Sequence, residues 1–481
     1  TNTLGRVRLE AAEGATGESS TRAGGSHGGL GGGTSGRVYG DPFAPGTLGG
    51  GGGAGGATGE IGGSGGGRIR IVADTVLLAV AIAADGTPGA AGPAGGGAGG
   101  SIWLTTGLLE GEGAITATGG AAGPTSPGGG GAGGRIRVDY TEASGFDVTR
   151  ITARGVGDIA GGPGTVLLAE DGASPELIVD NGGRDHLNAT GPFPQMGTVE
   201  VNGTPAVGAI KVPLIGTTDF LADQLVGLSV RFTNVPGTYP VSANTLTEVS
   251  FALVGTDLKT LGVVNGTGLT VVRTVPARLT IGGGARVMLV DELTFDALTL
   301  RDGASLRHPN AKNGDPEPAL DLTVLGAVTI DGTSSIDVSG RGFAGQSVPT
   351  FGVSAAGTTI GNTTYFMPKT LTGSGGSYGG LGAGTSPGDI YGSPLDPFTC
   401  GSGGGSGSSG AFGGTGGGRV RLVAASIDVA GTIRADGSAG GTGGDMKTGG
   451  GSGGSVWLEA DAMTVSGQLV ASGGAGGSGG G

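Results

Sequence analysis

The stretch Gly66-Gly67-Arg68-Ile69-Arg70-Ile71 decides the fold, because the chain repeats its pattern four more times. The further copies occupy residues 99–104, 133–138, 417–422 and 453–458. Consecutive copies begin 33 to 36 residues apart within each group. A fixed period of this size is typical of stacked repeats, each of which buries its apolar face against a neighbour. We therefore predict a solenoid.

The composition is dominated by glycine, with 118 Gly among 481 residues. Collagen is excluded, since Gly does not recur at every third position. Disorder is disfavoured, because 36% of the residues are hydrophobic and they come in short, regularly spaced β-branched runs. No window shows a capped helical period, so we predict an all-β protein in which glycine runs connect the strands.

Charge and cysteine content restrict the partners. The formal net charge of −13 argues against nucleic acid and anionic membrane surfaces. No apolar run reaches membrane-spanning length, so no membrane insertion is expected. The single Cys400 has no partner for an internal disulfide, which fits either a reduced compartment or a bacterial surface protein. Arg68, Arg70, Arg135 and Arg137 are expected on a solvated strand face.

The two ends of the chain are duplicates of one another. Residues 24–35 match residues 375–386 at ten of twelve positions, and Arg68 corresponds to Arg419 at the same offset of 351. We predict glycine-rich solenoid modules at 1–165 and 343–481, in which Trp103 corresponds to Trp457.

The middle of the chain divides into three parts. Residues 166–196 are expected to form connecting rungs. Residues 276–342 contain apolar-Thr-apolar triplets such as Leu279-Thr280-Ile281, which predict regular β-helix rungs with alternating inward and outward side chains. Residues 197–275 lack glycine runs and contain longer strands, so we predict an inserted small β-sandwich or β-barrel.

Several segments resemble a known group of proteins. Residues 162–168 and 177–183, together with 322–342, are similar to recurring parts of very large glycine-rich bacterial surface proteins of the adhesin and filament type. The resemblance covers most of the chain outside 197–275. It implies a β-solenoid at the cell surface or outside the cell, and it brings no catalytic residues.

Candidate chemistry is sparse. The densest polar cluster is Asp180-Asn181-Gly182-Gly183-Arg184-Asp185-His186, which contains an acid, a base and a cation. Asn-Gly and the flanking charges are also ordinary turn chemistry, and we prefer that interpretation. The three histidines, His27, His186 and His308, lie far apart in sequence and show no zinc-ligand spacing. No catalytic, cofactor-binding or metal-binding residue is therefore predicted.

Two further sets of residues have a structural and a binding interpretation. The Asp-Gly pairs at Asp85, Asp302, Asp331 and Asp436 could offer oxygen ligands to calcium, but turn formation explains them. Trp103 and Trp457 could stack on a sugar, but aromatic rings in glycine-rich repeats more often fill the packing.

These observations favour an extracellular structural protein that builds a surface fibre, sheath or adhesin stalk. A carbohydrate-binding adhesin is the alternative, and a β-helix polysaccharide-degrading enzyme is a weaker one. The chain begins with the strand-like Gly5-Arg6-Val7-Arg8-Leu9 and finishes in the glycine string 472–481. Because unpaired strand edges recruit other chains, we expect either head-to-tail self-association through the solenoid edges or a native polypeptide that continues through further modules.

Overall fold

The computed structural model describes a protein made of strands. It covers residues 22–33, 36–57, 59–125, 127–186, 191–192, 199–216, 225–233, 235–290, 292–311, 317–345, 373–384, 388–406, 412–442 and 448–477. Strands account for 39% of the residues and helix for 1%, which confirms the all-β prediction. In these ranges there is one short 3-10 turn, η1 (Val148–Arg150), and no helix long and apolar enough to cross a membrane.

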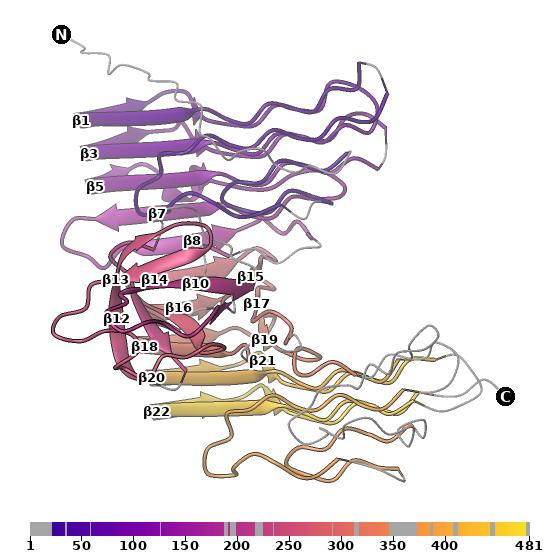
Figure 1. The fold of residues 1–481 in the computed structure, drawn as a ribbon. Coiled ribbons are helices and arrows are strands. Elements are labelled where there is room, and N and C mark those ends of the chain that lie inside the picture. The colour runs from indigo at the N-terminus through magenta and orange to yellow at the C-terminus, as the bar shows by residue number, and fades with distance from the viewer. Residues whose placement is uncertain are drawn as a thin grey trace. The chain divides into compact units, whose positions relative to one another are not determined.

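The chain forms two compact units (Figure 1). Unit 1 comprises residues 1–194, 275–288 and 295–305, and unit 2 comprises 195–274, 289–294 and 306–481. The expected first strand at Gly5–Leu9 and the last residues of the 472–481 string lie outside the described residues. The boundary of the second module, near residue 343, is also followed by residues that are not described.

In unit 1, parallel strands stack in the order in which the repeats follow one another. They are β1 (Arg68–Leu78), β3 (Ser101–Gly111), β5 (Arg135–Gly145) and β7 (Thr165–Glu170). The register places Ile69 beside Ile102, Ile136 and Val166 in turn. Equivalent apolar side chains therefore form a ladder, and the inner members Ile102 and Ile136 are fully buried.

Shorter strands complete unit 1. A second set of parallel strands comprises β2 (Ile82–Ala83), β4 (Ile115–Thr116) and β6 (Ile151–Thr152). Strand β8 (Glu176–Asp180) runs antiparallel to β7, so the strand direction reverses within the predicted connecting segment. The end of β14 (Gly268–Gly282) then pairs with β8 in parallel.

The glycine runs are not simple connections between strands, as the sequence suggested. They are extended segments that pack side by side beyond the strands (Figure 1), and we call them glycine arms. The arm 94–100 shows the pattern. Gly95 and Ala98 donate backbone hydrogen bonds to the segment 49–55, and Gly96 and Gly99 donate to the arm 129–134. The N–H groups of Gly97 and Gly100 donate to the segment 84–90.

Successive residues of the arm thus donate to three different neighbouring segments, and every third residue donates to the same segment. Three residues per turn is the period of the polyproline II helix, which makes no hydrogen bonds within itself and exposes all its backbone groups. The arm 129–134 repeats this arrangement, since Gly129 and Ala132 donate to Arg22 and Gly25. Neighbouring arms therefore satisfy one another's backbone groups in three directions.

Close contact between arms explains why glycine is required. A Cβ added at Gly95 would lie 1.8 Å from the carbonyl oxygen of Ala23, and one at Gly97 would lie 2.0 Å from that of Ser64. Real Cβ atoms do not approach backbone this closely, so the residues here must lack a side chain. Ala98 occupies a position where a methyl group fits and is fully buried.

Unit 2 contains the same arrangement in its second half. Strands β18 (Leu320–Ile330), β20 (Arg419–Val429) and β22 (Ser455–Val465) are parallel. The shorter β19 (Ser335–Asp337), β21 (Thr432–Arg434) and β23 (Gln468–Val470) are parallel to one another as well. The register sets Arg419 beside Ser455 and Arg421 beside Trp457, just as Arg68 and Arg70 lie beside Ser101 and Trp103.

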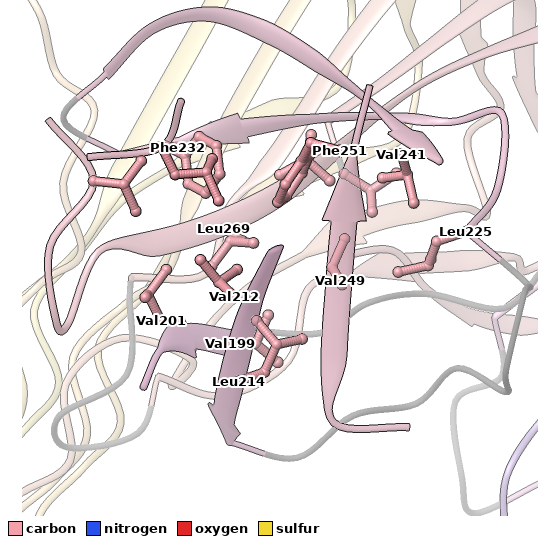
Figure 2. Packing of buried hydrophobic residues seen from close by; sticks show 14 of the residues in the cluster. Val199, Val201, Val212, Leu214, Leu225, Phe232, Val241, Val249, Phe251 and Leu269 are labelled. Carbon is pink, nitrogen blue, oxygen red and sulfur yellow. The ribbon is translucent and has the colours of Figure 1, made fainter. Parts of the chain in front are cut away.

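Residues 197–275 form a separate antiparallel part of unit 2. Its strands are β9 (Val199–Val201), β10 (Lys211–Gly216), β11 (Ser229–Phe232), β12 (Val235–Asn244), β13 (Glu248–Phe251) and the start of β14. They pair in the order β14, β11, β12, β13, β10 and β9, and β9 pairs again with β14, so the pairing forms a closed circuit. Phe232, Phe251 and Val249 belong to its apolar core (Figure 2).

The triplets in 276–342 lie where their alternation predicts. The remaining strands are β15 (Arg286–Met288), β16 (Glu292–Leu300) and β17 (Ser305–Arg307). In Leu279-Thr280-Ile281 both apolar side chains are fully buried, and the Thr280 hydroxyl donates to Glu176. Leu322 and Val324 are buried in the same way.

Candidate functional site

The polar cluster at 180–186 is a turn in which Asp180, Asn181, Asp185 and His186 have structural partners. The Asp180 carboxylate accepts a hydrogen bond from the N–H of Gly182 at 2.6 Å. Asn181 is fully buried, and its side chain bridges the backbone of Gly155 and Arg184. These contacts fix the backbone and leave no pair of carboxylates facing one another for acid–base chemistry.

The other two members of this cluster contact Arg286. Its guanidinium lies 2.6 Å from the exposed carboxylate of Asp185. The backbone N–H of Arg286 donates to the ring nitrogen Nε2 of His186 at 2.9 Å. His186 is almost fully buried, and its ring ties the turn 180–186 to the strand that begins at Arg286. The structure therefore does not bring Asp180, Asp185 and His186 together around a shared space.

Trp103 lies between two arginines from the strands on either side of β3. The guanidinium carbons of Arg70 and Arg137 are 4.4 and 4.9 Å from the ring centroid. The indole N–H donates to Asp139 at 2.7 Å, and Asp139 also pairs with Arg137 at 2.8 Å. Cation–π stacking covers both faces of the ring, so no face is open for a sugar.

The Asp-Gly turns use their carboxylates for the backbone. Asp85 accepts from the N–H of Thr118 at 2.7 Å, and Asp436 accepts from Ser472 at the same distance. Asp331 accepts from the N–H of Thr333, while Asp302 pairs with a neighbouring arginine. Among the described residues, no group of three His, Cys, Asp or Glu side chains is arranged to hold a metal ion.

Sequence reasoning missed a buried polar cluster where the strands meet the arms in unit 1. His27 contacts the carbonyl oxygen of Gly99 at 2.8 Å and the hydroxyl of Thr47 at 2.7 Å. Its ring lies 4.8 Å from that of Tyr39. Because a carbonyl only accepts, Nδ1 carries the proton and Nε2 accepts from Thr47. Burial, together with the charge of Arg135, lowers the pKa of His27 to about 3.

Arg135 is fully buried in the same cluster, so its predicted place on a solvated face is wrong. It donates to the carbonyl oxygens of Tyr39 and Pro192 and to the hydroxyl of Thr165. Burial lowers the pKa of Arg135 to about 10, which leaves the side chain protonated at neutral pH. The loop residues that cover it lie far away in sequence, which is why strand alternation alone did not reveal its burial.

Unit 2 contains the counterpart of this cluster. Tyr378 stands at the position of His27, stacks on Tyr391 at 4.9 Å, and shares a hydrogen bond with Ser455. The hydroxyl of Ser455 donates to Thr399, as Ser101 donates to Thr47 in unit 1. The duplicated pairing of His27 with Tyr378 is the signal in the sequence that points to this cluster.

The remaining reactive groups are also buried and bonded. The backbone N–H of Arg419 donates to Nε2 of His308, and Nδ1 donates to the carbonyl oxygen of Pro309. Burial lowers the pKa of His308 to about 3, although the bond to Pro309 acts in the opposite direction. Burial, with Glu317 nearby, raises the pKa of the Cys400 thiol to about 12. A thiol in this state is a poor nucleophile near neutral pH.

Comparisons with protein-family models, with curated proteins and with solved structures give no match for this chain. Function must therefore be argued from the geometry of the chain itself. The described polar clusters serve the backbone of the stack.

Proposed function

We propose that this chain is an extracellular structural protein, a β-solenoid with a β-barrel inserted between two duplicated modules. Its role would be that of a building block in a surface fibre, sheath or adhesin stalk. The observation that carries the proposal is the stacking shared by both modules: strands pair in parallel with those of the neighbouring repeat, and glycine arms bond to one another through their backbones.

Three features support a mechanical role. The glycine arms are joined by backbone hydrogen bonds in three directions, so their cohesion depends little on side chains. His27, His308 and Cys400 are buried, which keeps both histidines neutral and the thiol protonated near neutral pH. The polar cluster 180–186 forms a turn rather than a catalytic groove.

The proposal is tested by electron microscopy of the purified chain together with sedimentation over a hundredfold range of concentration. We expect elongated particles that associate end to end as the concentration rises. A compact monomer at every concentration would refute assembly through solenoid edges. A control sample with Val254→Ala, at a side chain of the inserted part that is 95% exposed, should still associate.

A further inference from the structure

The glycine arm 449–454 in unit 2 lacks one set of partners that its counterpart in unit 1 has. Four of its backbone N–H groups donate as in unit 1: those of Gly449, Gly451, Ser452 and Gly454. In unit 1 the two remaining positions, Gly96 and Gly99, donate to the arm 129–134. Their counterparts Gly450 and Gly453 donate to no carbonyl oxygen within the part of the chain that the structure describes.

A groove of about 580 Å³ lies at this position in unit 2. Its walls include Gly376, Gly453 and Gly474. By the offsets that relate the two modules, these residues correspond to Gly25, Gly99 and Gly120, and in unit 1 all three bond to the arm 129–134. The groove is thus lined by the same backbone that surrounds a bound glycine arm in unit 1.

The strand beyond the groove also lacks a neighbour. Arg421 from β20 covers one face of Trp457, with its guanidinium carbon 5.2 Å from the ring centroid. In unit 1 the following strand supplies Arg137 to the second face of Trp103. Among the described strands β22 pairs only with β20, so no strand supplies a counterpart of Arg137 to Trp457.

The apolar interior is open at the same edge. Met463 and Leu469 are 44% and 45% exposed, whereas their counterparts Leu109 and Ile115 are fully buried. An apolar hollow of about 530 Å³ is lined by Met463, Leu469 and Leu458. Exposed apolar side chains on an unpaired strand edge mark a surface that gains stability when another strand covers it.

We propose that this edge of unit 2 binds one further glycine-rich repeat of the same pattern. The partner segment is a Gly-Gly-Gly-x-Gly-Gly arm that leads into an Arg-apolar-Arg-apolar strand, as in residues 129–138. The arm fills the groove and accepts from Gly450 and Gly453, while the second arginine of the strand stacks on Trp457. Because this names the partner of one solenoid edge, it rests on the proposed function.

The test uses the full chain carrying Trp103→Phe, so that Trp457 is the only tryptophan, and a synthetic peptide with the sequence of residues 129–140. Titration of the peptide is followed by tryptophan fluorescence and by calorimetry. We expect saturable binding with a change in Trp457 emission. A peptide with Arg137→Ala should bind with a much smaller change in emission.

Glycines that line the groove provide matched controls. A side chain at Gly379 or Gly380 meets nothing within 4 Å, so both variants should fold. In unit 1 a Cβ added at Gly28, the counterpart of Gly379, would meet the arm 129–134. A Cβ added at Gly29, the counterpart of Gly380, would instead meet residues 162 and 163. Gly379→Leu should therefore weaken peptide binding at least tenfold, and Gly380→Leu should leave it within about threefold.

The outcomes separate this partner from the proposed function. No binding at millimolar peptide, or equal binding by a peptide with Ala at Gly129, Gly131 and Gly134, overturns the assigned partner even if the chain forms filaments. Binding that Gly379→Leu does not weaken overturns it as well. Peptide binding by a chain that never assembles would support the partner and refute the fibre.

Discussion

The glycine arms make a sharp prediction for Gly97→Ala. This substitution would place a Cβ 2.0 Å from the carbonyl oxygen of Ser64, so the segment 62–66 must move by about 1 Å. Three of the five backbone hydrogen bonds that hold that segment join it to the arm 94–100 and to Thr87: Gly63 to Gly95, Gly66 to Ala98, and Thr87 to Ser64, at 2.8 to 2.9 Å. A shift of this size lengthens them beyond hydrogen-bonding distance.

Each such bond contributes about 1 kcal/mol net, so we expect Gly97→Ala to lower the free energy of unfolding by about 3 kcal/mol. At about 2–4 °C per kcal/mol for a unit of this size, the melting temperature should fall by roughly 6–12 °C. Elsewhere Gly→Ala usually stabilises a chain by about 0.4–1 kcal/mol, because it restricts the unfolded state. Gly97→Ala is therefore expected to destabilise the chain, whereas Gly→Ala at a position without such a contact stabilises it.

Thermal melting and amide hydrogen exchange measure this effect. The matched control is Gly67→Ala, where an added Cβ meets nothing within 4 Å. In Gly97→Ala the amides of Gly63, Gly66 and Thr87 should exchange faster, while those of the control should not. If both variants melt within about 1 °C of the original chain, the arms do not pack as described.

Three other perturbations follow from the structure. Phe251→Ala should cost about 3–5 kcal/mol in chemical unfolding of the inserted part, whereas Val254→Ala, at a side chain that is 95% exposed, should cost less than about 0.5. His27 has a lowered pKa of about 3, so it stabilises the fold when neutral, and this contribution is lost as the pH falls from about 6.5 toward 3. His27→Tyr, which places the residue of Tyr378 at this position, should fold. Its free energy of unfolding should fall less than that of the original chain between pH 6.5 and 3, and equal pH profiles of the two chains would contradict this. Removing calcium with a chelator should leave the melting temperature unchanged, whereas Asp85→Ala should lower stability by about 1 kcal/mol, and a chelator effect on melting would indicate a metal site.

The strands and their inward faces could be predicted from the sequence. Ile69 and Ile71 alternate with arginines, and this period of two specifies which side chains enter the ladder with Ile102 and Leu104. The triplet at Leu279 gave the same information for the middle of the chain. Short-range alternation is sufficient here because parallel stacking brings equivalent positions of successive repeats together.

The glycine arms and the buried arginine could not be predicted in the same way. Six-residue glycine runs resemble flexible connections, since the sequence does not show which other segments are their neighbours; Ala132, for example, bonds to the distant Gly25. Arg135 is buried by Pro192 and by the loop that contains Tyr39, and both contacts depend on tertiary structure. The groove in unit 2 was missed for the same reason, because it is defined by the lack of an arm among the described residues and not by any particular side chain.

The arms also affect how stability depends on temperature. Unfolding a core of apolar side chains raises the heat capacity, whereas exposing backbone amides lowers it. A large part of this chain is held by amide groups, so its heat-capacity change on unfolding should be small for its length and its stability curve flat. Apolar cores lose stability on cooling, and the arms have little apolar surface to lose in this way. We therefore expect the modules to remain intact at low temperatures that weaken the inserted part, whose core consists of Val, Leu and Phe side chains.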